Sequence, residues 1–470
     1  VMAAARRSAR SSRRHTITVM LGQMAMVAVG ASDHVCTPDC PADRIRAAAD
    51  EPQGRAAAPT ADPNLMSLHL LPGAAATGAV CLDGSPGGMY FRPALSKAHA
   101  NDWIIHFKGA GWCYDEVDCL GRATVQAGGQ FGSSTSWPNT TSGWSGGLLS
   151  SDCSYNPDFC SFNKVILLYC DGASFTGDRE EPVVVQGRPL YFRGRRIMDA
   201  QMRLLLTDDR FNMAAAENVL LTGCSSGALA AYLHANHVQQ TIAAAAPGLV
   251  KFRVAPDSGF FLFHQNLAGQ AVYPDQIKQI FTLSNSSGGV NERCVAATSV
   301  PDRYKCMFAQ HVVGYIDAPT MVLNSALDAW QTSCIFTSKL PDGFPHQSSP
   351  SENGACNAFP NIRNCSSDPE ACNSSQMATM NSYLDDFLRA LEASPFYRKA
   401  GNGIFAHSCH THCEGIAGGW TYNISGVTMQ AAVSRWWHAD GTVPAHTNRH
   451  LPCRYHTYTS PHACNPSCPL

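Results

Sequence analysis

Short apolar runs typical of buried strands alternate along the middle of this chain with longer segments typical of helices. The runs that predict strands lie at residues 103–107, 164–170, 218–223 and 320–324. The segments that predict helices lie at residues 197–206, 228–237 and 380–391. Because strands and helices alternate, the pattern predicts an α/β fold with a largely parallel central sheet flanked by helices.

The two ends of the chain lack this alternation and predict separate segments. Residues 1–31 place five arginines before a moderately apolar run, which is the layout of a cleavable signal peptide. An organelle transit peptide is the alternative, because the segment is rich in Arg and Ser and has no acid. Residues 32–64 lack apolar periodicity and are expected to form a flexible linker. Residues 65–450 form the expected main domain, and residues 451–470 form a Cys-rich tail.

The composition indicates an exported protein. Twenty cysteines in 470 residues predict an oxidising compartment in which most of them pair, and five Asn-x-Ser/Thr sequons agree. We therefore expect a secreted protein of the extracellular space or cell wall. A net charge of -2 does not favour nucleic acid as a partner. The apolar run at residues 17–31 is shorter than the roughly 20 residues of a membrane span, so no stable membrane anchor is expected.

A cysteine-rich stretch interrupts the predicted main domain. Residues 333–377 are rich in Ser, Asn, Pro and Cys, and they predict a long disulfide-tied loop insertion rather than core.

The strongest chemical signal is the motif Gly-Cys-Ser-Ser-Gly at residues 223–227. It fits the G-x-S-x-G pattern and lies between a predicted strand and a predicted helix, as a nucleophile elbow of the α/β-hydrolase type requires. A sharp strand-to-helix turn tolerates only small flanking residues, and it lifts the serine hydroxyl above the sheet. Ser225 is therefore the candidate nucleophile.

A serine nucleophile needs a histidine base and an acid that orients it, in the order Ser, Asp or Glu, His. Asp328 follows a predicted strand and could present its carboxylate from a loop, while Asp257 is the alternative acid. Three histidines cluster C-terminal to both acids, at His407, His410 and His412. Composition alone leaves the choice among them open.

Cys409 and Cys413 lie within this histidine cluster, a density that also suggests zinc. The spacing matches no standard zinc pattern, and in an exported chain the two cysteines are more simply halves of disulfides. We therefore expect no metal and no cofactor.

A Gly-rich turn at residues 108–112 follows the first predicted strand and resembles an oxyanion hole. The expected donors are the amides of Ala110, Gly111 and Ser226. A phosphate-binding loop is the alternative for such a turn, but the chain lacks the G-x-x-x-x-G-K-[ST] pattern.

Together these segments resemble the pectin acetylesterase family, which also contains the animal Notum carboxylesterases. The resemblance covers residues 65–437 and rests on six segments in family order. They begin at Ala79 (AVCLDGSP), Gly109 (GAGWC), Tyr169 (YCDGASFTGD), Leu190 (LYFRG), Gly223 (GCSSG) and Asn324 (NSALDAWQ).

The resemblance implies an α/β-hydrolase fold and a carboxylic ester hydrolase with Ser225 as nucleophile, Asp328 as acid and His412 as base. It implies removal of O-acetyl groups from pectin or related wall polysaccharides. A Notum-like lipid-ester or palmitoleoyl-protein deacylase is one alternative, and a non-catalytic wall-binding protein on the same fold is another. The sequence departs from the usual family residues at Lys108, Ala110, Ser226, Ala228 and Glu414. These departures spare the three triad residues and alter the rim of the pocket.

Overall fold

The computed structural model describes most of the chain after its first 61 residues. The described residues are 62–124, 131–339, 356–452 and 460–469, and they belong to one compact unit that runs from Ala61 to Leu470. The predicted leader at residues 1–31 and all but the last three residues of the predicted linker lie outside the described residues. No helix in the described ranges combines the length and hydropathy needed to cross a membrane.

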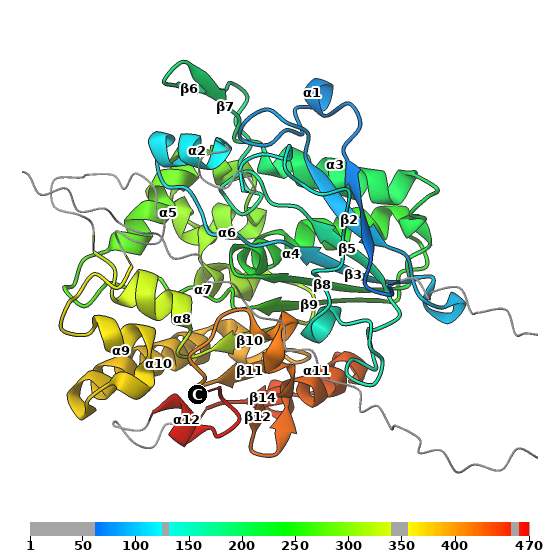
Figure 1. Cartoon of the computed structure of the whole chain (residues 1–470). Coiled ribbons are helices and arrows are strands. Elements are labelled where there is room, and N and C mark those ends of the chain that lie inside the picture. The colour runs from blue at the N-terminus through cyan, green and yellow to red at the C-terminus, as the bar shows by residue number, and fades with distance from the viewer. Residues whose placement is uncertain (1–61, 125–130, 340–355, 453–459, 470) are drawn as a thin grey trace, which may run out of the picture. The chain divides into compact units, whose positions relative to one another are not determined.

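A ten-stranded mixed sheet forms the centre of the described unit, in the order β14-β11-β10-β9-β8-β3-β5-β2-β1-β4 (Figure 1). The strands from β14 to β5 in this order run parallel, and β2, β1 and β4 complete the sheet in antiparallel orientation. The strands of this sheet are β1 (Met66–Leu70), β2 (Gly88–Arg92), β3 (Asp102–Phe107), β4 (Thr140–Thr141), β5 (Asn163–Leu167), β8 (Asn218–Cys224), β9 (Lys251–Asp257), β10 (Met321–Ser325), β11 (Gly403–His407) and β14 (Arg449–His450). Two small hairpins pair β6 (Val183–Val185) with β7 (Arg188–Leu190) and β12 (Asn423–Ile424) with β13 (Val427–Thr428).

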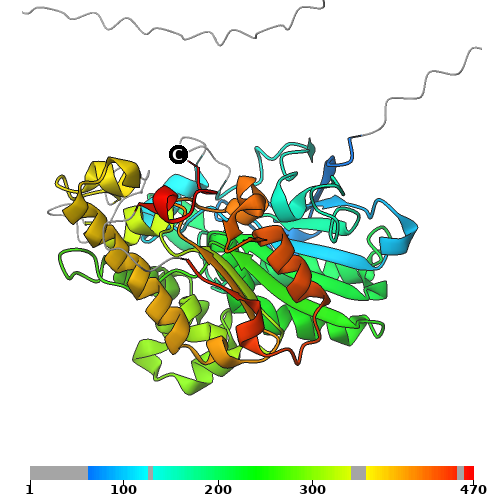
Figure 2. The same ribbon diagram turned by 90° about the horizontal axis from the view of Figure 1, so that it is seen from below.

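Both faces of the sheet are buried under apolar clusters. Successive side chains of a strand point to opposite faces, so each strand contributes residues to both clusters. In β3, Trp103 and Ile105 belong to one apolar cluster and Ile104 to the other. Helix α4 packs into the first cluster and α11 into the second, and Figures 1 and 2 show them on opposite sides of the sheet. The helices are α1 (Ala74–Thr77), α2 (Glu116–Ala123), α3 (Gly194–Thr207), α4 (Ser226–Ala245), α5 (Val272–Leu283), α6 (Glu292–Ala297), α7 (Ala309–Val312), α8 (Ala329–Gln331), α9 (Arg363–Ser367), α10 (Ser374–Ala393), α11 (Met429–His438) and α12 (Pro461–Cys464).

The predicted α/β architecture is confirmed, with differences at individual elements. The strands predicted at residues 103–107, 218–223 and 320–324 are β3, β8 and β10, and the three predicted helices are α3, α4 and α10. The strand predicted at residues 164–170 ends earlier, at Leu167. The next three residues are buried although they lie outside the strand, and Cys170 is tied to Cys81, so apolar character alone overstated its length.

Most of the described cysteines form disulfides, as the cysteine content predicts. Eight bridges join sixteen of the described cysteines, and Cys464 is also disulfide-bonded. The predicted insertion at residues 333–377 carries two of them, Cys334–Cys356 and Cys365–Cys372. Its assignment as a loop outside the core is wrong for several described residues, because Ile335, Phe336 and Ile362 are buried in the main apolar cluster.

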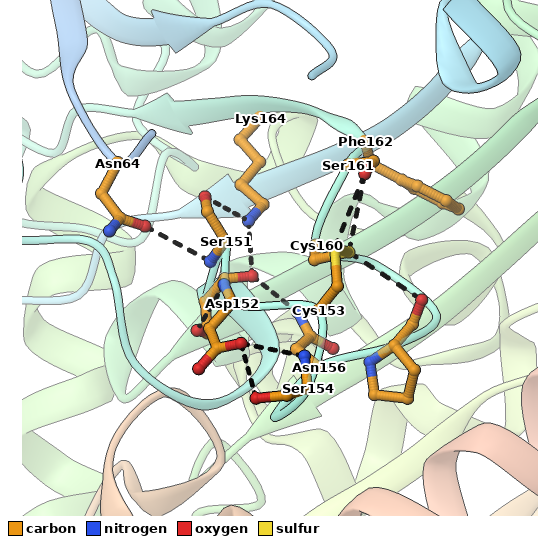
Figure 3. Close-up of a disulfide and its surroundings, with 12 residues drawn as sticks. Asn64, Ser151, Asp152, Cys153, Ser154, Asn156, Cys160, Ser161, Phe162 and Lys164 are labelled. Carbon is orange, nitrogen blue, oxygen red and sulfur yellow. Dashed lines mark hydrogen bonds between the residues drawn. A yellow bond between two sulfur atoms is a disulfide. The ribbon is translucent and has the colours of Figure 1, made fainter. Parts of the chain in front are cut away.

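A small loop closed by the Cys153–Cys160 disulfide supports the C-terminal half of the unit (Figure 3). Lys164 of β5 donates hydrogen bonds to the carbonyl oxygens of Leu149 and Ser150, in the segment just before this loop, both at 2.8 Å. The indole of Trp420 donates to the carbonyl oxygen of Tyr155. The loop therefore packs against the segment that follows residue 413 and binds it through Trp420.

Candidate active site

Ser225 lies at the sharp turn between the end of β8 and the start of α4, as predicted. It has φ 60° and ψ −130°, a backbone conformation that non-glycine residues rarely adopt. A Cβ at Gly223 would lie 2.3 Å from the carbonyl oxygen of Gly227, and a Cβ at Gly227 would lie 2.1 Å from that of Phe107. Only glycine fits at these two positions, because backbone packs directly against backbone around the serine.

The structure pairs one of the three clustered histidines with a carboxylate. His412 Nδ1 lies 2.8 Å from Oδ2 of Asp328. Asp328 is fully buried at the N-terminus of α8, where its Oδ1 also accepts a hydrogen bond from the amide of Gln331. Its carboxylate is thus fixed by helix capping, and it accepts the Nδ1 proton of His412, which leaves Nε2 available as a base.

The other two histidines of the cluster make different contacts. His407 is buried at the end of β11, and burial lowers its pKa to about 3. His410 Nε2 lies 3.0 Å from the hydroxyl oxygen of Thr332. Neither forms an ion pair with a carboxylate in the described structure, so the geometry favours His412 as the base.

A disulfide joins the residues next to the candidate nucleophile and the candidate base. Cys224 precedes Ser225, Cys413 follows His412, and the two cysteines are bonded with their Cα atoms 5.5 Å apart. Segments 189 residues apart in the chain are thereby held at the same edge of the sheet. Cys409 is bonded to Cys468, so the prediction that Cys409 and Cys413 are halves of disulfides is confirmed. Neither sulfur is a free thiolate that could bind zinc.

Asp257, the alternative acid, makes different contacts from Asp328. Its carboxylate accepts hydrogen bonds from the hydroxyl of Ser258, at 3.2 Å, and from the amide of Gly415, at 2.9 Å. Asp257 therefore binds the backbone of the loop that carries His412, and in the described structure it does not bind the imidazole itself. Our sequence reasoning missed this role and missed Ser258; the available signal was a buried strand, residues 251–257, ending in Asp-Ser-Gly.

The Gly-rich turn after β3 packs directly on the elbow. A Cβ at Gly109 would lie 2.1 Å from the carbonyl oxygen of Cys224 and 3.0 Å from Cβ of Ser225. The carbonyl oxygens of the next two residues accept hydrogen bonds from side chains outside the turn. That of Ala110 accepts from Arg122, and that of Gly111 accepts from the hydroxyl of Tyr169, each at 2.7 Å.

One of the three expected oxyanion donors is occupied in the free protein. The amide of Ala110 donates to Oγ of Ser226 at 2.8 Å. Ser226 is buried, and its own amide belongs to the first residue of α4, where a helix offers no partner. An oxyanion could use the Ala110 amide only if it shared that donor with the Ser226 hydroxyl or displaced the hydroxyl.

The electrostatics of the site are dominated by carboxylates around the imidazole. Burial alone would lower the pKa of His412, but the negative charges of Asp328, Asp257 and Glu414 raise this pKa above its ordinary value. Burial raises the pKa of Asp257 to about 7. Lys108 is the first residue of the Gly-rich turn, and burial lowers its pKa. Its ammonium lies 5.4 Å from the ring centre of Phe131.

Comparison with known proteins identifies the family of this chain. A family model described as Pectinacetylesterase matches residues 60–469. Pectin acetylesterase 11 of Arabidopsis thaliana is 31% identical over 407 residues, which cover 86% of this chain and 92% of that protein. Pectin acetylesterase 7 of the same plant is equally similar.

More distant likeness extends to animal enzymes. Mouse palmitoleoyl-protein carboxylesterase NOTUM is 26% identical over 278 residues, covering 57% of this chain and 51% of that protein. The crystal structure of the Drosophila Wnt deacylase Notum superposes with a TM-score of 0.64 at 20% identity, covering 86% of this chain and 99% of the other. The fold is therefore that of an α/β-hydrolase.

Removing the Cys224–Cys413 bridge should lower the reactivity of Ser225 as well as the stability of the fold. We expect the double substitution C224A/C413A to lower the free energy of unfolding by about 2–5 kcal/mol. We also expect it to slow the labelling of Ser225 by a fluorophosphonate probe at least about tenfold, because His412 is no longer held beside the serine. The matched control is C294A/C306A, which opens a distant bridge. Equal labelling rates in the two variants would contradict this expectation.

Neutralising Glu414 should shift the protonation of His412. Glu414→Gln removes one of the charges that raise the pKa of His412, so the pKa should fall. A base must be unprotonated to act, so the acidic limb of the labelling rate should move to lower pH, by about 0.3–0.5 unit. The pH profile of the labelling rate measures this shift. The exposed Glu370, changed to Gln, is the control, and a profile that stays in place in E414Q would refute the electrostatic assignment.

Proposed function

We propose that this chain, which belongs to the pectinacetylesterase family of carboxylesterases, removes O-acetyl groups from pectin or a related cell-wall polysaccharide with a Ser225-His412-Asp328 triad. The observation that carries the proposal is the hydrogen bond between His412 and Asp328 beside an elbow that holds Ser225. Family membership supports the reaction class, and the names of the plant relatives support the substrate class.

The proposed reaction has two mirrored steps. His412 Nε2 takes the proton of Ser225 as its Oγ attacks the acetyl carbonyl, and the same imidazolium then protonates the sugar oxygen as its bond to the acetyl carbon breaks, which releases the sugar hydroxyl. Water, deprotonated by His412, attacks the acetyl-serine and releases acetic acid. Asp328 stabilises the imidazolium formed in each step, because its buried carboxylate lies 2.8 Å from Nδ1.

The proposed oxyanion hole uses the amides of Gly111 and Ser226, with Ala110 as a third donor. Arg122 and Tyr169 bind the carbonyl oxygens of the turn, which keeps the orientation of its peptide planes. Such preorganised donors typically contribute about 10²- to 10³-fold each. The Ala110 amide donates its hydrogen bond to the Ser226 hydroxyl before substrate binds. Ala110 can therefore stabilise the oxyanion only when this hydrogen bond breaks or is shared.

The place of action proposed is the extracellular space or the cell wall. The disulfides of the described residues support it, because such bridges persist in oxidising compartments. The predicted signal peptide at residues 1–31 is consistent with this route.

An acidic polysaccharide is the favoured substrate. Lys108 borders the Gly-rich turn, and no described side chain forms an ion pair with it. A partly buried cation without a counter-charge gains most from an anionic group on a ligand. A uronate carboxylate close to the acetyl ester would supply that group.

A long acyl chain, as in the Notum-like alternative, is less well supported. The rings of Trp112, Phe261, Tyr273 and Trp330 pack against one another with centroids 5.0–6.3 Å apart. Phe261 also lies 6.3 Å from the His412 ring. Aromatic side chains thus occupy the apolar space beside the base, which favours a short acyl group.

Acetate release from a panel of polymers tests the proposal. We expect the wild-type protein to release acetate from acetylated polygalacturonate faster than from acetylated xylan, and Ser225→Ala to lower the rate by at least about 10³-fold. Ser96→Ala, at an exposed serine in the segment before β3, is the control and should behave as wild type. A folded S225A protein that retains the wild-type rate removes the triad, and a wild-type protein that no fluorophosphonate labels supports the non-catalytic alternative.

Acyl-chain profiling separates the two ester classes. We expect kcat/KM for p-nitrophenyl esters to fall steeply from acetate to octanoate, because aromatic rings pack against one another beside His412. Phe261→Ala should flatten this profile by opening space beside His412. Phe159→Ala is the matched control, since it removes a buried ring from the apolar cluster on the opposite face of the sheet. A wild-type preference for octanoate would favour the lipid-ester alternative.

A further inference from the structure

Asp257 is a buried acid at the carboxyl end of β9 that the proposed reaction does not use. Its Oδ2 accepts a hydrogen bond from the amide of Gly415 at 2.9 Å, and its Oδ1 accepts one from the hydroxyl of Ser258 at 3.2 Å. The same Ser258 oxygen accepts from the amide of Cys413 at 2.8 Å. Two backbone amides, one and three residues after His412, are thus bound by this Asp-Ser pair.

The backbone of Asp257 also contacts the nucleophile. Its carbonyl oxygen accepts a hydrogen bond from the amide of Ser225 at 3.1 Å. In the pairing of β8 with β9, Asp257 lies opposite Cys224. One residue therefore binds the elbow through its main chain and the base-bearing loop through its side chain.

We propose that Asp257, together with Ser258, is a positioning residue that holds His412 in register with Ser225. The proposal rests on the function proposed above, because it assigns a role within the same reaction. The Cys224–Cys413 bridge constrains the two segments covalently, but it leaves torsional freedom in the loop beyond residue 413. The hydrogen bonds to the amides of Cys413 and Gly415 remove that freedom.

The fit around the carboxylate is close on every side. A Cβ at residue 415 would lie 3.0 Å from Cγ of Asp257, so the loop approaches the acid as closely as glycine allows. Ser258 has φ 56°, a left-handed conformation that is costly for serine and that aligns its hydroxyl with the amide of Cys413. Strain of this kind persists where the surrounding contacts fix it, often at functional sites.

The charged and titratable groups that face this pair come from three directions. Asp328, from the β10–α8 connection, and Glu414, from the base loop itself, act with Asp257 on the imidazole of His412. Tyr232 of α4 lies within the field of Asp257. Loss of the Asp257 charge should therefore lower the pKa of His412, and loss of its hydrogen bonds should displace the imidazole.

Two substitutions, each made in the whole 470-residue chain, separate these effects. Asp257→Ala removes the acceptor, so we expect kcat for p-nitrophenyl acetate to fall about 10- to 100-fold while KM changes by less than about twofold. Asp257→Asn can accept from Gly415 through its oxygen and donate to Ser258 through its nitrogen. We therefore expect D257N to restore most of kcat and to move the acidic limb of kcat/KM to lower pH.

The matched control is Asp102→Ala. Asp102 is also a buried carboxylate with two side-chain partners, His99 and Asn218, but it lies at the opposite end of β3. We expect D102A to lower the melting temperature and to leave kcat per titrated active site unchanged. If D257A behaves in the same way, Asp257 is merely structural and the proposal is overturned.

A measurement that needs no turnover keeps the two proposals distinguishable. The Nδ1 proton of His412, shared with Asp328, should give a downfield proton resonance in the wild-type protein and in D257N, and the resonance should be lost in D257A. If the wild-type protein hydrolyses no ester but this pattern holds, the proposed function fails and the positioning role stands. If the resonance persists in folded D257A, the positioning role is overturned.

Discussion

The close approach of three backbone segments at the carboxyl edge of the sheet is the constraint on which the site depends. The Gly-rich turn after β3 and the elbow after β8 pack there main chain against main chain. The Cys224–Cys413 disulfide and the side chains of Asp257 and Ser258 hold the loop after β11 beside them. A Cβ at Gly109, Gly223 or Gly227 would lie between 2.1 and 2.3 Å from a carbonyl oxygen. Because parallel strands end at a common edge, each of these segments begins close to the others.

Once the segments are together, burial decides the chemistry that each side chain can perform. Asp328 is the N-cap residue of α8 and its carboxylate binds His412, whereas the carboxylate of Asp257 binds the backbone amide of Gly415. Two aspartates that follow neighbouring strands therefore take different roles, because their hydrogen-bond partners differ. The charges of both raise the pKa of the imidazole, which burial alone would lower.

The family relationship accounts for the fold and the reaction class, while the proposed substrate rests on residues at the rim of the candidate site. Ser226 fills an oxyanion donor with its hydroxyl, and Lys108 places a cation beside the same turn. The aromatic cluster around Phe261 borders the base. These positions lie at the edge of the triad, where they can change which ester is accepted and leave the proton transfers unaltered.

The sequence by itself determined the α/β class, the elbow at Ser225 and the expectation that most cysteines form disulfides, because periodicity, small residues in a sharp turn and compartment chemistry are local or compositional properties. It could offer two acids and three histidines but could not choose among them without the family resemblance. Only the tertiary structure shows that Asp328 binds His412, that Asp257 binds a backbone amide instead, and that Ile335 and Phe336 join the core. Which partner a carboxylate meets depends on segments more than 80 residues apart, brought together by strand order and by disulfides that no local pattern encodes.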